Sequence, residues 1–556
     1  MGEGIFGTLH PFLEGGAVYG RKVANVGFME ALLRLDPFEE YHFFVADPDA
    51  LRAAFAARRD LPAAAREAVK IFGRQELAGA LRVTPYHCFH LSDPIAGQPE
   101  LTSLRNALAP RLFPITSVNH TLSYADYALR FLAQIWPGVT RRDAVGATSR
   151  AASKVLEGYF AQLREGYHLD PSWPQPRLEI IPLGVDPAAF SGLVPEARRT
   201  ARARFGLAAE ETVCLLHGRI SLDDKLDALP VLYALRRVME EVPSARPRLV
   251  LSGGARPGDH YPEALEAAAR ALKVPLTLAP DPSPEDVRQL FAAADVFVSP
   301  SDNIQESFGL TLLEAGAAGL PSVVSDWDGY RDLVEHETSG FLVPTLAPAA
   351  TPLLDCRART LPDNIHQMYR AQQTAVDVPA LAEALRRLVC DAPLRERMGR
   401  AARRRVLENF TWEGVIRRWL AFWDALRREP LSPADEERAR TARHPAFLRL
   451  GELFCGHPSA TLSVEAPGLW VRTTARGERV RAGREFCISW PGLEHCLDGA
   501  DFRGMLVQAR HPARADELIR RACPPGRSAE GARFALLWAL KNDLLECVGN
   551  PADLPT

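Results

Sequence analysis

The chain has 556 residues, of which 47% are hydrophobic and 24% are charged, and its formal net charge is −3. This balance is typical of a globular protein with several domains, and it excludes a disordered, collagen-like or coiled-coil chain. Lys and Arg number 66 against 69 Asp and Glu. Without a basic excess to neutralise phosphates, we expect no nucleic-acid partner.

No uncharged apolar run approaches the roughly 18 residues that a membrane-spanning helix needs, and the first residues lack the pattern of a signal peptide. We therefore expect a cytoplasmic protein. The nine cysteines include no CxxC pair, which argues against a disulfide framework or a zinc ribbon. Five cysteines fall near the C-terminus, some of them close to His457 and His495: Cys455, Cys487, Cys496, Cys523 and Cys547. For these cysteines, buried reduced thiols are favoured over a metal site.

Short apolar runs alternate with amphipathic stretches over the first 430 residues. The runs predict buried parallel strands at Tyr41–Ala46, Phe113–Val118, Thr212–Leu216, Arg248–Ser252 and Ala294–Ser299. The stretches predict helices at 17–34, 149–164, 225–241, 261–272, 285–293 and 379–389. Such alternation predicts a doubly wound α/β architecture, and the length fits two such units.

Composition divides the chain into four parts. A strand gives way to a Pro/Gly turn at Ile180–Phe190, and the character of the chain changes again beyond Pro433. The predicted parts are a Rossmann-like domain over 1–190, a second one over 191–410, a terminal helix and linker over 411–432, and a small α+β domain over 433–556. A Pro-rich stretch, 343–363, predicts a surface insertion.

The last part predicts short strands around a turn at Ala475–Arg479, followed by helices at Ala515–Ala522 and Ala529–Leu545. This order is loosely similar to small winged-helix domains, some of which bind peptides by adding a strand to a sheet edge. A packing appendix is the alternative, and DNA binding ranks behind both. For the arginines of 395–405, a solvated helix face is favoured over a peripheral membrane contact.

The clearest functional signal is ADVFVSPSDNIQESFGLTLLEAGAAGL at 294–320. A strand ends there and a helix opens near Gly309, so Glu306 falls in the loop and Glu314 in the helix. Open α/β sheets bind ligands at the carboxyl ends of their strands, where both carboxylates can face one crevice. The free amides of Phe308, Gly309 and Leu310, with the helix dipole, favour a phosphate.

A second signal is LLHGRISLDDK at Leu215–Lys225. Arg219 and Lys225 follow a strand, where they can neutralise a diphosphate, although surface pairing with Asp223 or Asp224 is an equal alternative. Glycine pairs at other predicted strand ends allow close backbone approach to a ligand, and each alone is weak evidence; they are Gly15-Gly16 and Gly253-Gly254.

The order of these motifs, with IPLGVD between them and VVSDWDGYRD after them, closely resembles the retaining GT-B glycosyltransferases of the glycogen-synthase-like superfamily (glycosyl transferases group 1, family 4). The resemblance covers about residues 1–428. It implies two Rossmann-like domains facing a cleft; the insertion at 343–363 and the small α+β domain after 433 are extra to the family pattern.

The resemblance also implies roles for single residues. Arg219 and Lys225 look like the diphosphate clamp, Glu314 like the ribose-binding glutamate and Glu306 like the residue that holds donor-sugar hydroxyls. Gly16 is similar to the glycine of the phosphate loop. His120 follows a predicted strand and resembles a histidine that approaches the donor sugar.

The expected activity is therefore transfer of a sugar from a nucleotide-diphosphate sugar, with retention of anomeric configuration and without metal or cofactor. The acceptor is open: a saccharide, a lipid, a protein or a small molecule. A non-catalytic nucleotide-sugar-binding or targeting protein is the alternative, and a sugar-nucleotide epimerase ranks behind it. A pyridoxal-phosphate phosphorylase is disfavoured because no lysine lies between Lys273 and Lys541.

Overall fold

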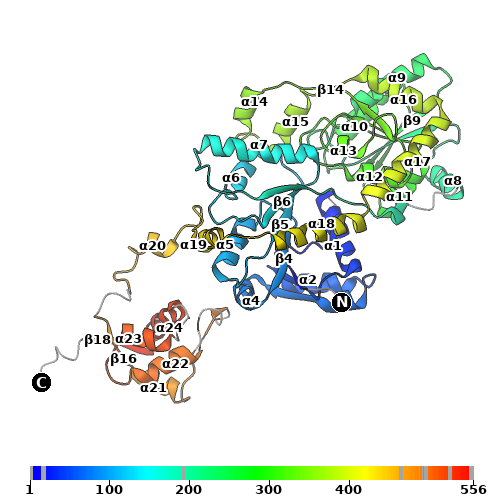
Figure 1. The fold of residues 1–556 in the computed structure, drawn as a ribbon. Helices are drawn as coiled ribbons and strands as arrows, with labels where there is room; N and C mark the ends of the chain where they lie inside the picture. Colours follow the sequence, from blue (N-terminus) through cyan, green and yellow to red (C-terminus); the bar gives the residue numbers. More distant parts are fainter. Residues whose placement is uncertain are drawn as a thin grey trace, which may run out of the picture. The chain divides into compact units, whose positions relative to one another are not determined.

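The protein is represented by a computed structural model, which describes residues 4–13, 20–190, 195–462, 468–487, 489–490, 492–493, 497, 499–523 and 529–549. The chain divides into two compact units, Met1–Ala446 and Phe447–Thr556. The first unit contains two parallel sheets, and Figure 1 shows each of them flanked by helices. The predicted pair of Rossmann-like domains is therefore present within this unit.

The first sheet has the strand order β3-β2-β1-β4-β5-β6-β7, with every pair parallel. Its strands are β1 (Ile5–Thr8), β2 (Glu40–Val45), β3 (Val69–Gly73), β4 (Tyr86–Leu91), β5 (Ile115–Val118), β6 (Asp143–Ala147) and β7 (Arg177–Ile180). Its helices are α1 (Gly20–Leu35), α2 (Pro48–Ala57), α3 (Ala63–Ala68), α4 (Leu77–Val83), α5 (Gln98–Leu108), α6 (Tyr127–Leu132) and α7 (Arg150–Gly166). The central strands are buried, which explains their continuous apolar sequence.

The second sheet has the order β10-β9-β8-β11-β12-β13 and is also parallel. Its strands are β8 (Thr212–His217), β9 (Pro247–Gly253), β10 (Leu276–Pro280), β11 (Val296–Ser299), β12 (Ser322–Ser325) and β13 (Gly340–Val343). Its helices are α8 (Pro195–Arg204), α9 (Leu229–Glu241), α10 (Tyr261–Leu272), α11 (Pro284–Ala293), α12 (Leu310–Ala317), α13 (Tyr330–Leu333), α16 (Val378–Cys390) and α17 (Ala392–Asn409).

After the second sheet the chain returns to the first domain through α18 (Trp412–Arg428). Trp419 of this helix packs edge-on against Phe28, with ring centroids 6.5 Å apart. Trp423 is fully buried, and its Nε1 donates a hydrogen bond to Thr116 Oγ1 at 2.9 Å. Helix α18 therefore completes the core of the first domain, although the second domain precedes it in the chain.

The start of α18 fixes the point where the chain crosses between domains. Val185 N donates to Phe410 O at 2.9 Å, and Trp412 N donates to Val185 O at 3.1 Å. A Cβ at Gly27 would lie 2.3 Å from Trp412 Nε1, and one at Gly184 would lie 2.8 Å from Trp412 Cα. Both positions need glycine because the tryptophan approaches their backbones so closely.

The insertion predicted at 343–363 is longer and more regular than expected. It runs between the paired strands β14 (Thr345–Leu346) and β15 (Ala375–Val376), which are antiparallel. It contains α14 (Pro352–Arg357) and α15 (Asp363–Ala371). Two of the prolines that suggested an irregular stretch, Pro352 and Pro362, stand at or next to the starts of these two helices, where a missing N–H costs nothing.

The second unit has a three-stranded sheet of order β17-β16-β18, and both its pairs are antiparallel. Its elements are α20 (Leu450–Leu453), β16 (Trp470–Thr473), α21 (Ala475–Arg481), α22 (Gly499–Gln508), β17 (Ala513–Arg514), α23 (Ala515–Ala522), α24 (Glu530–Lys541) and β18 (Leu545–Val548). The described helices and strands form an α+β arrangement around one buried apolar cluster.

The predicted turn at Ala475–Arg479 is wrong, because these residues begin α21. Thr474 caps that helix: its side-chain oxygen accepts a hydrogen bond from Gly477 N at 2.9 Å. A threonine cap directly before the segment favours a helix over a hairpin turn.

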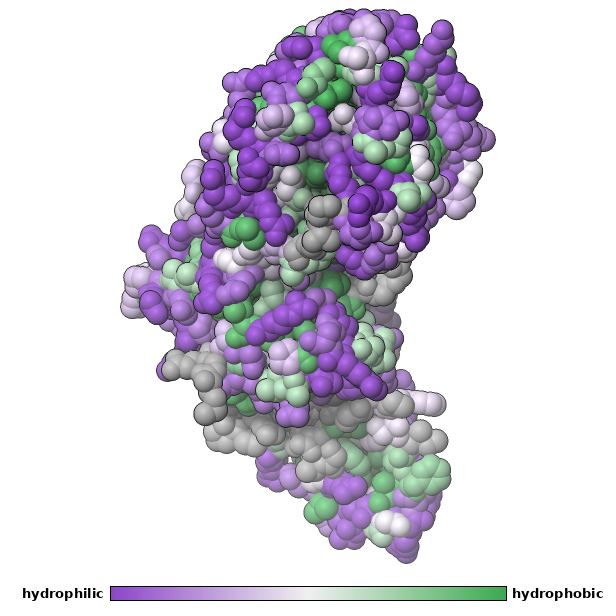
Figure 2. All heavy atoms as spheres, turned by 90° about the vertical axis from the view of Figure 1, so that its right-hand side faces the viewer, coloured by the Kyte–Doolittle hydropathy of each residue, from purple (hydrophilic) through white to green (hydrophobic). Residues whose placement is uncertain are grey.

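No helix among the described residues is both long and apolar enough to cross a membrane. On the face that Figure 2 shows, hydrophilic side chains predominate and hydrophobic ones are scattered in small groups.

The compact units meet at Ala446 and not at Pro433, the boundary that the sequence predicts. The intervening helix, α19 (Pro433–Thr441), packs on the first domain: Asn106 Nδ2 donates to Ala439 O at 3.0 Å, and Arg440 Nη1 donates to Ala109 O at 2.9 Å. The composition changes at Pro433 because α19 is a polar surface helix. The change does not mark a domain boundary.

A chain that ends at Ala446 should therefore be more stable than one that ends at Ser432. Removing α19 deletes several hydrogen bonds to the first domain, each contributing about 1 kcal/mol, so the free energy of unfolding should fall by about 2–4 kcal/mol. Urea denaturation of both chains, followed by tryptophan fluorescence, measures the difference. Equal midpoints and slopes would show that α19 contributes nothing to this unit.

Candidate functional site

Strand order in the second sheet reverses between β8 and β11, and a crevice opens at such a point above the carboxyl ends of the strands. The loop after β8 carries Arg219 and Lys225, and the loop after β11 carries Glu306. Both sequence signals therefore fold to the same point of the sheet, although about 80 residues separate them.

Lys225 is the residue that joins the two loops. Its Nζ lies 2.6 Å from Glu306 Oε2, and both side chains are 13% exposed. Its charge also acts on Glu314, whose pKa it lowers against the larger opposing effect of burial. One ammonium group thus influences both of the carboxylates that the sequence singles out.

Those carboxylates differ in protonation. Burial opposes ionisation of Glu306, but the charge and hydrogen bond of Lys225 hold its pKa below the ordinary value. Burial raises the pKa of Glu314 to about 7, because the Lys225 charge offsets only part of the desolvation cost. Near neutral pH, Glu306 is a carboxylate and Glu314 is divided between its charged and neutral forms.

Arg219 takes the alternative pairing that the sequence left open. Its Nη1 donates to Asp224 Oδ2 at 2.7 Å, and its Nη2 donates to the Asp224 carbonyl at 3.0 Å. The Arg219 side chain is still 36% exposed. A guanidinium has five N–H donors, so this pairing leaves donors for another anion.

The SFG turn between Glu306 and α12 is shaped by Gly309. Its φ is +107°, and a Cβ there would lie 2.6 Å from Tyr330 Cε1, so only glycine fits. Phe308 is buried, and its amide lies 3.5 Å from Glu306 Oε1. Leu310 is the first residue of α12, so its amide belongs to the helix N-terminus.

The structure describes one of the two predicted glycine pairs, Gly253-Gly254. Gly253 has a φ of +145°, and a Cβ there would meet Gly218 O at 1.7 Å, so β9 ends directly against the loop that leads to Arg219. Gly254 O accepts a hydrogen bond from Ile220 N at 2.8 Å in the same contact. The predicted phosphate-loop residues, Gly15 and Gly16, lie outside the described residues.

His120 lies after β5 of the first domain, and the structure brings it to the loop after β11 of the second domain. Its carbonyl accepts a hydrogen bond from Ser307 Oγ, directly beside Glu306. His120 Nε2 lies 3.0 Å from Asn25 Oδ1, and since a carbonyl oxygen accepts, Nε2 carries the proton. Burial lowers the pKa of His120 to about 3, so the ring is neutral at physiological pH.

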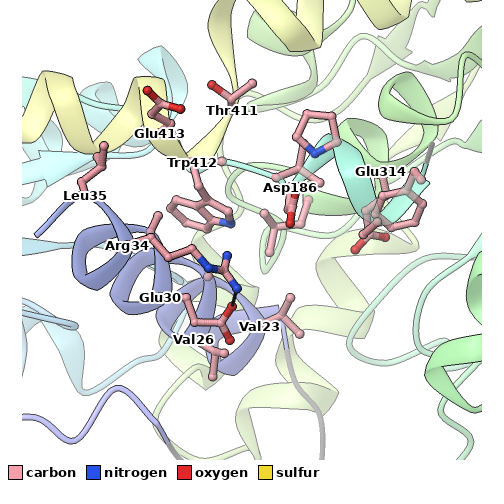
Figure 3. Close-up of a pocket in the computed structure, with 18 of the residues that line it drawn as sticks. Val23, Val26, Glu30, Arg34, Leu35, Asp186, Glu314, Thr411, Trp412 and Glu413 are labelled. Carbon is pink, nitrogen blue, oxygen red and sulfur yellow. Dashed lines mark hydrogen bonds and ion pairs between the residues drawn. The ribbon is translucent and has the colours of Figure 1, made fainter. Parts of the chain in front are cut away.

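A cavity of about 930 Å³ lies where the two domains face each other. Helix α1, the crossing segment Gly184–Phe190 and the start of α18 line it, together with Leu310 and Glu314 of α12. Figure 3 shows Trp412 at its centre, the ion pair of Glu30 and Arg34 on the α1 side, and Glu314 entering from the other domain. Glu306 is absent from this lining and stays with Lys225.

The site contains acidic groups that sequence reasoning missed. Asp328 has a φ of +42°, and its buried Oδ2 has no hydrogen-bond partner among the described residues. Burial, and then the charge of Glu306, raise its pKa to about 8. Asp302 also has a pKa raised to about 8, by burial and then by Asp227. The motif VVSDWDGYRD contained Asp328, but its left-handed backbone is invisible in sequence.

The first domain has a reversal of strand order of its own, between β1 and β4. His10 follows β1, and its Nδ1 lies 2.9 Å from Ser92 Oγ after β4. The neighbouring Asp93 is buried, which raises the pKa of its carboxyl to about 6, while Arg21 acts in the opposite direction. Sequence analysis singled out none of these residues, because each is isolated in the chain.

Within the described ranges, no group of three or more His, Cys, Asp or Glu side chains could hold a metal ion. The described C-terminal cysteines, Cys455, Cys487, Cys523 and Cys547, form no disulfide within these ranges. They are exposed or half-buried, so the prediction of buried thiols is wrong for them, and His495 and Cys496 lie outside the described residues.

Comparison with known families matches residues 211–354 to the family described as "Glycosyl transferases group 1". A "D-inositol 3-phosphate glycosyltransferase" of Nocardioides sp. is 31% identical over 279 residues, which are 48% of this chain and 52% of that protein. The protein of the same name from Geodermatophilus obscurus is 37% identical over 193 residues, 34% of this chain and 40% of that protein. The matched part of the chain thus spans about half of the length of these relatives, or less.

Two solved structures share the fold. A glycosyltransferase from Rickettsia africae superposes with a TM-score of 0.52 and 14% identity, covering 77% of this chain and 99% of that one. Anabaena Alr3699/HepE, solved "in complex with UDP and glucose", superposes with a TM-score of 0.51 and 16% identity, covering 76% of this chain and all of that one. The first unit therefore has the GT-B fold. Within the second domain of this unit, residues 211–354 form the segment that matches the group 1 family.

Replacing Glu314 by Gln should change the pH dependence of stability. The pKa of Glu314 is raised from 4.5 to about 7 in the folded chain, so the wild type loses stability as pH rises through this interval. Gln does not ionise, so Glu314→Gln should match the wild type near pH 4.5 and exceed it above pH 7 by roughly 1–3 kcal/mol. Melting temperatures across this range measure the effect, and a difference independent of pH would contradict the assignment.

Proposed function

We propose that the protein transfers a glycosyl group from a nucleotide-diphosphate sugar to an acceptor held by the first domain. The observation that carries this proposal is the position of Lys225, hydrogen-bonded to Glu306 and close enough to act on Glu314, at the strand-order reversal of the second sheet. A cation with two carboxylates suits a ligand that has both phosphates and hydroxyls.

The diphosphate is assigned to Arg219, Lys225 and the N-terminus of α12. Arg219 has an exposed face beyond its pairing with Asp224, and Lys225 supplies a point charge. The amides that begin α12, near Gly309, add a partial positive charge. The charge that develops on the departing diphosphate would be met by groups that are already oriented.

The two carboxylates are assigned to hydroxyl groups. Glu306 is held ionised beside Lys225 and would accept hydrogen bonds from the donor sugar. Glu314 lines the cavity between the domains and would hold the ribose, which places the nucleoside at the α1 side. A hydroxyl both donates and accepts, so it can pair with Glu314 in either protonation state.

Retention of anomeric configuration is part of the proposal. Glu306, the carboxylate nearest the assigned sugar position, is already bound to Lys225, which makes it a weak nucleophile. Departure of the diphosphate and attack of the acceptor on the same face, through an oxocarbenium-like transition state, needs no covalent intermediate. His120 would then contact the sugar as a neutral ring that orients it.

The acceptor is assigned to the strand-order reversal of the first domain. Asp93 and His10 lie there, largely buried, and the charge of Arg21 acts on Asp93, so polar groups and one cation are available to a hydroxylated compound. The names of the curated relatives make D-inositol 3-phosphate the first acceptor to test, because an arginine can pair with its phosphate.

Replacing Arg219 or Glu314 by Ala should weaken donor binding. Each change removes a polar partner from a desolvated site, at about 1.5–3 kcal/mol, or roughly ten- to a hundred-fold in Kd. Calorimetry with UDP-glucose, and with other nucleotide sugars if that one does not bind, measures the loss. Arg270→Ala is a matched control, since Arg270 is an exposed cation of the same domain that pairs with Glu266 on its own helix. Unchanged Kd values in both site variants would refute the donor assignment.

Transfer should also persist after removal of divalent cations, because Arg219 and Lys225 neutralise the leaving diphosphate in this proposal. The rate with excess EDTA should stay within about two-fold of the untreated rate, since no metal supplies the charge stabilisation. Loss of transfer in EDTA, with recovery on adding magnesium, would show that the clamp residues do not suffice.

A further inference from the structure

Helix α15 of the insertion contacts the first domain through specific hydrogen bonds. Asp363 Oδ1 accepts a hydrogen bond from Ala125 N at 3.1 Å. One turn later, Gln367 Nε2 donates to Ser123 Oγ at 2.9 Å. Ser123 and Ala125 belong to the loop that directly follows His120, so the insertion holds that loop at its backbone and at a side chain.

The same helix and the residue after it contact the Lys225 loop of the second domain. Asn364 Nδ2 donates to Asp223 Oδ2 at 2.5 Å, and Gln372 Nε2 lies 3.3 Å from Asp227 Oδ2. These aspartates stand two residues before and two residues after Lys225. The insertion therefore braces both sides of the loop that carries the clamp lysine.

The insertion is held together by contacts among its own residues. Its ends are paired in the short sheet of β14 and β15. Arg370 Nη1 binds Asp355 Oδ1 at 2.6 Å and Thr351 Oγ1 at 2.9 Å, which ties α15 to α14. Burial lowers the pKa of His366, which faces the inside of the insertion as a neutral ring. Figure 1 shows α14 and α15 on the side of α7.

Other contacts between the domains do not involve the insertion. Ser307 O accepts a hydrogen bond from Ser149 Oγ at 3.1 Å, and Arg150 Nε binds Asp332 Oδ1 at 2.5 Å. These contacts lie at the SFG turn, which follows Glu306, and at α13, and they do not involve Asp223 or Asp227 of the Lys225 loop. Loss of the α15 contacts should therefore loosen two particular loops without separating the domains.

We propose that α15 is a positioning element that holds the Lys225 loop and the loop after His120 in a fixed mutual arrangement before any donor binds. Asp363 and Gln367 provide the contacts to the first domain, and Asn364 and Gln372 provide those to the clamp loop. Neither group touches the assigned substrates. The catalytic consequence rests on the proposed function, whereas the fixed arrangement does not.

Hydrogen exchange of the ligand-free full chain tests the arrangement without reference to activity. Asp363→Ala removes the acceptor of the Ala125 amide, so exchange in the peptide spanning 121–126 should become about ten-fold faster, as expected for loss of one net hydrogen bond. Asp363→Asn keeps an acceptor oxygen and should retain the wild-type rate. Arg359→Ala, at an exposed position between the two helices, is the control and should change nothing.

If Asp363→Ala also speeds exchange within α15 itself, Gln367→Ala is the second variant, because it leaves the start of the helix intact. It should accelerate exchange over 121–126 by a similar factor. Unchanged exchange there in both Ala variants would overturn the proposal, and so would Asp363→Asn behaving like Asp363→Ala.

Asn364→Ala tests the link to the clamp. Exchange over 223–227 should rise about two- to ten-fold through loss of the bond to Asp223, since Arg256 Nη1 still binds Asp223 Oδ2 at 2.8 Å. The kcat of transfer should fall about ten-fold while the KM for donor changes less than three-fold, since a misplaced Lys225 charge costs most in the transition state. Faster exchange with unchanged kcat would contradict the positioning role and leave the donor assignment standing. Absence of transfer in the wild type would instead refute the proposed function alone.

Discussion

The hydrogen-bonded ion pair of Lys225 and Glu306 is the contact on which the site depends. It spans the strand-order reversal of the second sheet, where the connections after β8 and β11 diverge and leave a crevice. Without the lysine, Glu306 would be a desolvated carboxylate with a raised pKa, as Glu314 and Asp328 already are. One short contact thus decides which of these carboxyls is charged, and it places a cation where a diphosphate would lie.

The segments that connect the two domains determine how this site faces the first domain. Trp412 fits between Gly27 of α1 and Gly184 of the crossing segment, and α18 then continues into the core of the first domain. The cavity between the domains is lined by these same elements together with Glu314. The segment that crosses between the domains and a candidate binding site therefore share residues, so changes at Trp412 would alter both packing and the cavity.

Local sequence order was enough to predict the two sheets and the position of the donor-side residues. The central strands are continuous apolar runs, and polar residues in the loops after them must fold to the carboxyl edge of a parallel sheet, as Glu306 and Lys225 do. Arg219 could not be settled in this way, because Asp224 is five residues away and competes with any ligand.

What the sequence could not predict depends on distant contacts or on backbone conformation. The bonds of α15 to Ala125 and Ser123 join residues of different domains, and no local pattern announces them. The raised pKa of Asp328 follows from burial and from the nearby charge of Glu306, and its backbone is left-handed; none of these features has a sequence signature. The family resemblance assigns roles to motif residues only, so it could not predict the contacts that the insertion and α19 make.

The central claim is that Lys225 serves a reaction in which a nucleoside diphosphate leaves a sugar. The most direct measurement is release of nucleoside diphosphate from a panel of nucleotide sugars, with D-inositol 3-phosphate and other hydroxylated acceptors, by the wild type and by Lys225→Met. The account predicts release from at least one donor by the wild type and a loss of about 10²–10³-fold in the variant, the size typical for removing one preorganised charge-stabilising group. Release at equal rates by the two proteins, or tight donor binding by the wild type with no release under any condition, would contradict it.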